Sequence, residues 1–423
     1  MRTSIHTALA ITILWAGALS ANTGTIAFIG ATLIDGTAAE PLANSVILVT
    51  DGRIRAVGTT TDVTIPDDAQ RIYVSGKTIM PGMINAHGHA GDSQGLESGH
   101  YSRDNLLDHL ALYARYGITT VFSLGGDRPA GIQVRNEQFT PTLNRARLFA
   151  AGTVVNGDDR DSIRRQINAN ADMGTDFIKT RVDSELGELP TIDPALFQYL
   201  VDHAHARRLP VAVHIYYLED AKMVLRAGAN LIAHSVRDRI IDDEFIRLLR
   251  ENDVCYIPTL MRDVSTFIYE NEPEFFADPF FLREADPFVV EELSSPEYQS
   301  RIRNSASAQQ YKADLPNAVA NMGMLYRSGV GIAMGTDTGP PGRFQGYFEH
   351  LELQMMVNGG LSPLDAIRSA TGVAAECMGV TDIGTIEPGN WADLIVLGAN
   401  PAEDIGNTRS IESVWIAGNR VPN

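Results

Sequence analysis

Four histidines and one aspartate stand at the ends of apolar runs, where a folded chain usually continues with core residues. These residues are His87, His89, His214, His234 and Asp337. His87 and His89 are two residues apart, and because side chains alternate along a strand, a strand there would place both imidazoles on one face. Imidazole nitrogen and carboxylate oxygen are ligands that suit Zn²⁺ and related divalent metals. The set therefore predicts a metal site.

Taken singly, each of these residues has a simpler interpretation. A lone histidine at a strand end is most often a hydrogen-bonded structural residue, and an aspartate such as Asp337 often caps the following turn. The metal interpretation depends on all five reaching one place. It also leaves Lys179 to be explained, because this residue directly follows the apolar pair Phe177 and Ile178. A lysine is almost never fully buried unless something pairs with it.

The elements that would bring these residues together can be read from the order of apolar and amphipathic segments. Short apolar runs alternate with amphipathic stretches such as 103–116 and 194–208, a pattern typical of βαβ units and a parallel sheet. Eight continuously apolar runs favour a closed (β/α)₈ TIM barrel over an open sheet. The runs are 82–90, 117–126, 145–155, 175–180, 209–217, 229–235, 252–260 and 329–337. In such a barrel the carboxyl ends of the strands build the active site.

Two segments flank the expected barrel, and one long segment interrupts it. Residues 24–80 and 384–423 alternate and turn like antiparallel strands, so we expect a small β-sandwich domain made from both termini. The barrel domain would then span 81–383. Residues 261–315, between the seventh and eighth runs, are rich in Phe, Glu and Pro. Their length favours a lid over the site, and an oligomer contact through the same apolar residues is the alternative.

Residues 1–21 have the features of a signal peptide. Arg2 precedes an apolar stretch that ends in the small-residue junction at 18–20, and the stretch is shorter than the about 20 residues that span a bilayer. We expect a periplasmic or secreted protein with no stable membrane association after cleavage, and an uncleaved anchor is the alternative. The net charge of −18 argues against nucleic acid as a partner. Cys255 and Cys377 lie in apolar segments, and we expect both to be buried thiols.

Several motifs together resemble those of the amidohydrolase superfamily. They are "MPGMINAHGHA", "DFIK", "VAVHIYY", "ANLIAHS", "GTDTG" and "GTIEPGNWADLIVL", and the resemblance extends over the chain after residue 21. It implies the binuclear branch, related to prolidases and imidazolonepropionase, in which a lysine at the position of Lys179 carries a CO₂-derived carbamate that bridges two metals. A carbamate is an anion, which would explain a lysine at the end of an apolar strand.

The resemblance also implies a role for each polar residue. His87, His89 and Asp337 would hold one divalent ion and His214 and His234 the other, with Zn²⁺ as the expected metal and a hydroxide between the two ions. Asp337 would act as general base and then general acid. Tyr216 is similar to a family tyrosine that contacts substrate, and His100 and Arg181 are further substrate-binding candidates at the rim. Where prolidase-like relatives carry an Arg-Asp pair, this chain has Phe122 and Ser123, so dipeptidase specificity does not transfer directly.

These observations predict a hydrolase of an amide-type C–N bond that acts on a small molecule, with dipeptides or N-acyl amino acids as favoured substrates. A lactonase or esterase is one alternative, because the same hydroxide attacks either carbonyl. A mononuclear deaminase fits less well, because Lys179 occupies the bridging position. A non-catalytic small-molecule binding protein is the alternative from another class, and it would be favoured if a metal ligand were missing. The sequence leaves open whether the protein is a homo-oligomer.

Overall fold

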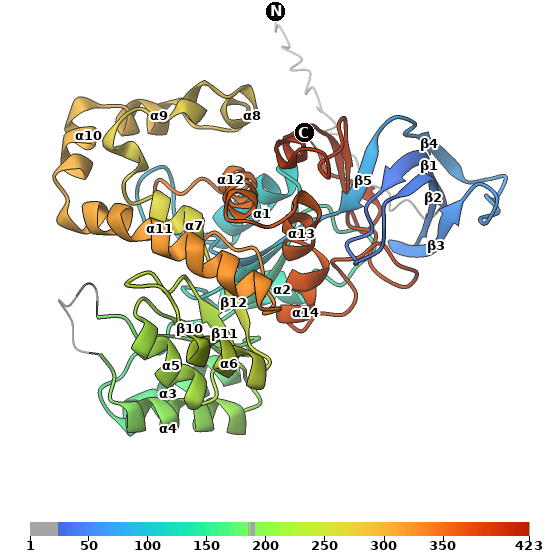
Figure 1. Ribbon diagram of the computed structural model, residues 1–423. Helices are drawn as coiled ribbons and strands as arrows, with labels where there is room; N and C mark the ends of the chain where they lie inside the picture. Colours follow the sequence, from blue (N-terminus) through green and yellow to red (C-terminus); the bar gives the residue numbers. More distant parts are fainter. Residues whose placement is uncertain (1–23, 185, 187–190, 423) are drawn as a thin grey trace, which may run out of the picture.

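The computed structural model describes residues 24–184, 186 and 191–422. The expected signal peptide, residues 1–21, lies outside these residues. Strands and helices alternate through the middle of the chain (Figure 1). The helices between the strands are α1 (Arg103–Arg115), α2 (Pro129–Asn136), α3 (Arg160–Met173), α4 (Pro194–Ala206), α5 (Leu218–Arg226) and α6 (Asp243–Glu251). Each buries an apolar stripe, as an amphipathic helix that covers a sheet should.

Seven of the eight predicted central strands are present, and they form two parallel sheets. One sheet contains β6 (Met83–Gly88), β7 (Ile118–Ser123) and β8 (Arg147–Ala150); the other contains β9 (Ile178–Arg181), β10 (Val211–His214), β11 (Leu231–Ala233) and β12 (Cys255–Ile257). Their order in space follows their order in the chain. All seven strands are almost entirely buried, which explains their continuous apolar character.

The eighth predicted strand, 329–337, is irregular in the structure. Only single bridges form there, between Tyr256 and Ile332 and between Gly88 and Thr338. The backbone of Asp337 is left-handed (φ 57°), a conformation that a regular strand does not allow. A further bridge joins Val155 to Thr180. The two parallel sheets are therefore connected through isolated bridges on both sides.

The segment after β12 is helical. It contains α7 (Leu260–Val264), η1 (Ile268–Glu270), η2 (Glu274–Ala277), α8 (Pro279–Leu282), α9 (Pro287–Leu293), α10 (Pro296–Arg303) and the start of α11 (Ala306–Arg327), and the chain continues into α12 (Tyr347–Asn358), α13 (Pro363–Ser369) and α14 (Gly372–Cys377). Phe275, Phe276 and Phe281 are buried against Tyr347 and Phe348. These three aromatic residues are therefore packed inside the chain, whereas Phe288 of the same segment is 80% exposed.

Both termini contribute to one mixed sheet of eight strands, drawn in blue and red at one end of the molecule (Figure 1). Its strands are β1 (Ile26–Leu33), β2 (Leu42–Thr50), β3 (Arg53–Thr59), β4 (Gln70–Tyr73), β5 (Thr78–Pro81), β13 (Leu394–Leu397), β14 (Ile411–Ile416) and β15 (Asn419–Arg420), and η3 (Ile405–Arg409) precedes β14. The order is β15-β14-β13-β5-β1-β2-β3, with β4 beside β1. Phe28 of β1 and Trp415 of β14 lie 5.1 Å apart at their ring centroids although two strands separate β1 from β14.

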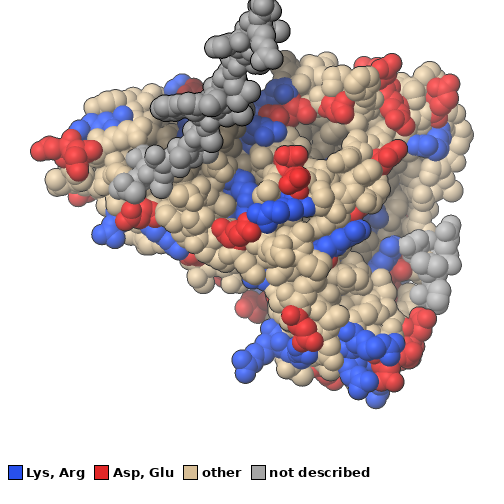
Figure 2. All heavy atoms as spheres, turned by 180° about the vertical axis from the view of Figure 1, so that it is seen from behind, with Lys and Arg blue, Asp and Glu red and all other residues tan. Residues whose placement is uncertain are grey.

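Cys255 and Cys377 form a disulfide, so the prediction of two buried thiols was wrong. Cys255 begins β12 and Cys377 ends α14, and the fold brings together two positions that are 122 residues apart in the chain. Sequence spacing cannot indicate such a pairing. None of the helices in the described residues combines the length and the apolar character needed to cross a membrane. Acidic and basic side chains are interspersed on the face shown in Figure 2.

A buried ion pair connects β8 to the residue that precedes β13. Arg147 and Asp393 have side chains 1% and 3% exposed, and the guanidinium makes two hydrogen bonds to the carboxylate, at 2.9 and 3.2 Å. The guanidinium also donates to the carbonyl of Gln138 and lies 4.6 Å from the ring centre of Trp391. The pair therefore attaches the sheet of the two termini to the first parallel sheet.

We expect Asp393→Ala to lower the free energy of unfolding by about 3–5 kcal/mol, because removing one partner leaves the Arg147 charge buried and uncompensated. Asp382→Ala is the matched control. This substitution breaks the ion pair between Asp382 and Arg53. Because the Arg53 and Asp382 side chains are 34% and 43% exposed, the free energy of unfolding should fall by less than about 1 kcal/mol. Urea unfolding followed by circular dichroism measures both. Equal effects of the two substitutions would contradict this assignment.

Candidate metal centre

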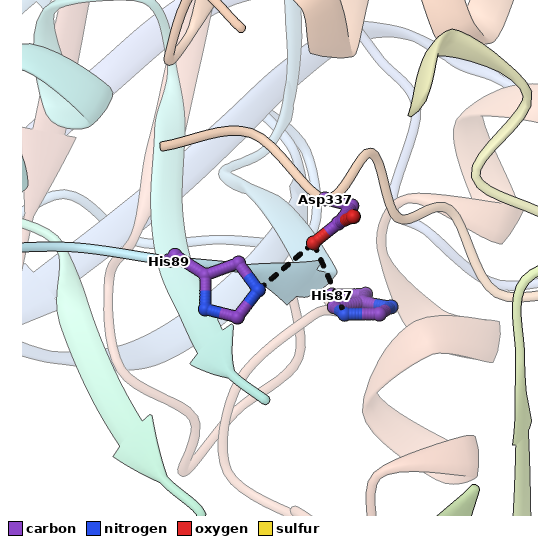
Figure 3. Close-up of side chains that lie close together, drawn as sticks. All are labelled: His87, His89 and Asp337. Carbon is purple, nitrogen blue, oxygen red and sulfur yellow. Dashed lines mark hydrogen bonds and ion pairs between the residues drawn. The ribbon is translucent and has the colours of Figure 1, made fainter. Parts of the chain in front are cut away.

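β6 and the segment before α12 place three of the predicted ligands together (Figure 3). The Nε2 atom of His89 lies 2.8 Å from Oδ1 of Asp337, and Nε2 of His87 lies 3.4 Å from the same oxygen. The ligand atoms of the three residues all lie within 4.8 Å of one another. The spacing of two residues between the histidines indeed directs both rings toward Asp337.

The other three predicted ligands lie beside this group. The His234 ring is 4.6 Å from that of His87 and 4.1 Å from that of His214, between centroids. The Nζ atom of Lys179 is 3.4 Å from Nε2 of His87. Lys179 is the second residue of β9, His214 ends β10 and His234 directly follows β11. The structure therefore brings all six side chains together, three of them from parallel strands of the second sheet or the residue that follows one.

Burial favours the uncharged forms that bind metals. It lowers the pKa of His214 to about 3, with the charge of Arg262 acting in the same direction and the hydrogen bond to Asp183 against it. Burial also lowers the pKa of His87 and His234 well below the usual value. It lowers the pKa of Lys179 to about 7, which nearby Asp337 partly offsets. Metals bind neutral imidazole, so this donor set fits divalent ions.

One buried nitrogen of the site has no hydrogen-bond partner among the described residues. This atom is Nδ1 of His87, and such an atom is costly unless something binds it. By contrast, Nδ1 of His89 lies 2.9 Å from the carbonyl oxygen of Gly125, and Nδ1 of His234 lies 2.7 Å from Oγ1 of Thr259. Contacts of this kind orient an imidazole so that its other nitrogen can bind a metal.

A buried hydrogen-bond network connects the segment that carries His87 with the segment that carries Asp337. Glu349 of α12 accepts hydrogen bonds from Thr336 and Thr338, on both sides of Asp337, and from Asn85. Asn85 in turn accepts from the backbone N–H of His87 at 3.0 Å. Burial raises the pKa of Glu349 to about 7. Sequence reasoning missed Glu349, because nothing in the helical pattern of α12 distinguishes it from a surface residue.

Sequence reasoning also missed several charged residues next to the predicted metal ligands. Nη1 of Arg343 donates to Oδ2 of Asp337 at 2.5 Å, and Nε of Arg262 lies 3.9 Å from the same oxygen. The charge of Arg343 contributes to a pKa of Asp337 well below the usual value, against the effect of burial. Oδ2 of Asp183 lies 3.0 Å from Nε2 of His214. Both arginines follow strand ends in loops or short helices, where no sequence period signals them.

The three predicted substrate contacts differ in their positions. Tyr216 is buried, donates to Asp314 of α11 and lies against Arg237, whose guanidinium is 4.6 Å from the ring centre. Nη2 of Arg181 lies 3.3 Å from Oδ2 of Asp183, the oxygen that also contacts His214.

The third candidate, His100, contacts Glu97 at 3.5 Å and has a side chain 37% exposed. Among the described contacts, it touches none of the six predicted ligands. The structure therefore brings Tyr216 and Arg181 to the surroundings of the site, whereas His100 stays in the outer loop.

Comparison with known proteins gives consistent matches. A sequence model described as "Amidohydrolase family" matches residues 78–421. The ochratoxinase of Aspergillus niger is 24% identical over 286 residues, which cover 65% of this chain and 52% of that protein. The chain therefore spans about half the length of this relative. The imidazolonepropionase of Halobacterium salinarum is 23% identical over 394 residues, 86% of this chain and 88% of that protein.

Solved structures of low sequence identity have the same fold. A Xaa-Pro dipeptidase with bound methionine in its active site superimposes with a TM-score of 0.75 at 22% identity, over 95% of this chain and all of the other. The structure of A. niger ochratoxinase gives 0.71 at 21% identity, over 94% of this chain and 95% of the other.

Proposed function

Because this chain belongs to the amidohydrolase family, we propose that it is a metal-dependent hydrolase that cleaves an amide-type C–N bond in a dipeptide or an N-acyl amino acid. The observation that carries this proposal is the convergence of six potential ligands beside the two parallel sheets. None of the six is missing, which argues against a binding protein without catalytic activity.

We propose that His87, His89 and Asp337 hold one divalent ion, and that His214 and His234 hold a second, with Zn²⁺ as the metal. Two such ions supply a water of lowered pKa as the nucleophile. We further propose that Lys179 bridges them as a carbamate. With a pKa lowered to about 7, a large share of its amine is neutral at neutral pH, and the neutral amine adds CO₂ with loss of one proton.

The residues of the chain would then perform three tasks. Asp337 accepts a proton from the attacking water and transfers it to the leaving nitrogen. Arg343, 2.5 Å from the Asp337 carboxylate, keeps that carboxylate oriented. Tyr216 and Arg181 contact the substrate at the rim, and the segment 261–315 covers it as a lid.

We also propose the fuller architecture. The two parallel sheets and the irregular eighth segment close into one (β/α)₈ barrel over 81–383, supported by the bridges from Val155 to Thr180, Tyr256 to Ile332 and Gly88 to Thr338. The sheet of 24–80 and 384–423 folds over as a sandwich, supported by the contact of Phe28 with Trp415 and a bridge from Arg53 to Trp391. Residues 1–21 direct export, and the disulfide suits an oxidising compartment.

The test combines metal analysis with a substrate screen. We expect about two divalent ions per chain after mild dialysis, and hydrolysis of at least one dipeptide or N-acyl amino acid by the zinc-loaded protein. Matched lactones and esters are screened in parallel. A protein that retains two ions but cleaves only lactones or esters would replace the amide proposal with that alternative, and a stable content of one ion would contradict the binuclear centre.

A further inference from the structure

Three buried or nearly buried arginines lie at one side of the candidate metal centre, and they share two carboxylates. Arg237 pairs with Asp263, and Arg343 pairs with Asp337. Arg262 approaches both carboxylates, with Nη1 3.2 Å from Asp263 and Nε 3.9 Å from Asp337. Among these described ion pairs, three guanidinium groups therefore face two carboxylates, and one positive charge has no carboxylate of its own.

Arg262 combines unused hydrogen-bonding capacity with partial exposure. The Nε atoms of Arg262 and Arg237 both have no hydrogen-bond partner among the described residues, but the Arg262 side chain is 11% exposed whereas Arg237 is fully buried. The Arg262 guanidinium lies 4.3 Å from the ring centre of Tyr311. The charge of Arg262 also helps to lower the pKa of both His214 and His234.

The position of Arg262 is fixed by the turn that carries it. Glu352 of α12 accepts hydrogen bonds from the backbone N–H groups of Leu260 and Met261 at 2.8 and 2.6 Å. Thr259, which precedes them, contacts His234. The arginine is thus attached to a short, well-anchored helix at the end of β12 rather than to a free loop, and such an anchor preorganises a binding group.

We propose that Arg262 binds a carboxylate of the substrate, so that the enzyme selects amides in which the amino acid half carries a free carboxylate. This inference rests on the proposed function and names the substrate class within it. A buried charge without a full partner is costly, and metal ions on Asp337 would add further positive charge. A carboxylate offsets that charge, and guanidinium and carboxylate groups match in bidentate geometry. A neutral lactone offers no such group.

The first test compares an N-acyl amino acid that the enzyme hydrolyses with its C-terminal carboxamide. For wild-type protein we expect kcat/KM to be about 100-fold lower for the carboxamide, the size expected when one partner of a buried charge pair is removed. Arg262→Met should lose about 100-fold on the free acid, mainly through KM, and much less on the carboxamide. Its metal content should equal that of the wild type.

Arg301→Met is the matched control, because Arg301 also stacks on a tyrosine within the segment 261–315, 4.3 Å from the ring centre of Tyr298, but is exposed. It should keep the preference for the free acid. Arg128 is the alternative candidate for binding the substrate carboxylate, because it lines a cavity of about 240 Å³ together with His89. Loss of the preference in Arg128→Met but not in Arg262→Met would overturn the proposal, as would an equal loss of both substrates in Arg262→Met.

A binding measurement separates this inference from the proposed function. Calorimetry of the zinc-loaded protein with N-acetyl-L-alanine and N-acetyl-L-alaninamide should show binding of the acid at least about tenfold more tightly, a difference that Arg262→Met abolishes and Arg301→Met retains. No preference for the acid in wild-type protein would overturn the inference. If the protein binds the acid more tightly through Arg262 but hydrolyses no amide in the screen, the carboxylate site at Arg262 is supported and the proposed hydrolysis is refuted.

Discussion

Lys179→Ala is expected to lower kcat/KM by roughly 10³- to 10⁵-fold, because it removes the proposed bridge and with it several kcal/mol of metal-assisted catalysis. At least one metal ion should be lost. The fold should persist, because the side chain lies near His87 and, among the described residues, forms no ion pair that its removal would break. Steady-state kinetics, elemental analysis and circular dichroism measure the three effects.

Rescue makes the result specific. If the carbamate acts as a bridging carboxylate, then formate, acetate or propionate should occupy the space left in Lys179→Ala and restore part of both metal binding and turnover. Lys179→Arg provides the comparison, because arginine keeps the positive charge and does not form a carbamate. The bridging role predicts almost no activity for this variant. An active Lys179→Arg enzyme with its full metal content would contradict the proposal that Lys179 bridges the two metal ions.

Asp337→Asn should lower kcat by roughly 10²- to 10⁴-fold, the usual contribution of a general acid–base residue. The amide is a weaker ligand, cannot take the proton from water, and leaves Arg343 without the carboxylate to which it donates at 2.5 Å. We therefore expect KM to change less than kcat, together with a lower metal content. Kinetics and elemental analysis on the purified variant measure both.

The control for Asp337→Asn makes the same chemical change at another buried carboxyl group. Glu349 accepts hydrogen bonds from Thr336 and Thr338, and burial raises its pKa to about 7, so part of it is already uncharged at neutral pH. Glu349→Gln keeps an accepting oxygen there, and its effect on kcat should lie at the low end of the about 10- to 100-fold range typical of residues that support metal ligands. If both variants lose activity equally while retaining two metals, Asp337 has no special role in proton transfer.

The sequence allowed the candidate ligands to be predicted because each follows a local rule. His87 and His89 share a strand face through their spacing of two, and the others end apolar runs in a chain of βαβ units. These features depend only on neighbouring residues, and the structure places them as the local rules require. The role of residues 261–315 as a lid, expected from their length and composition, stays a prediction.

The residues that were missed depend on contacts between distant parts of the chain. Glu349 and Arg262 sit on helices, and their importance follows only from what those helices pack against. The pairing of Cys255 with Cys377 is set by where β12 begins and α14 ends in space. The eighth segment is irregular and ends in a left-handed backbone at Asp337, which its apolar sequence pattern does not indicate.

The disulfide also changes the covalent topology of the molecule. It closes the chain between residues 255 and 377 into a ring, and that ring contains the helices of 261–315, Arg262 and Asp337. A single proteolytic cut in those helices would open the ring without separating Asp337 from the histidines that precede Cys255. The two pieces would stay at a high effective concentration. A cut enzyme could therefore reassemble its site after unfolding, and only reduction would release the C-terminal piece.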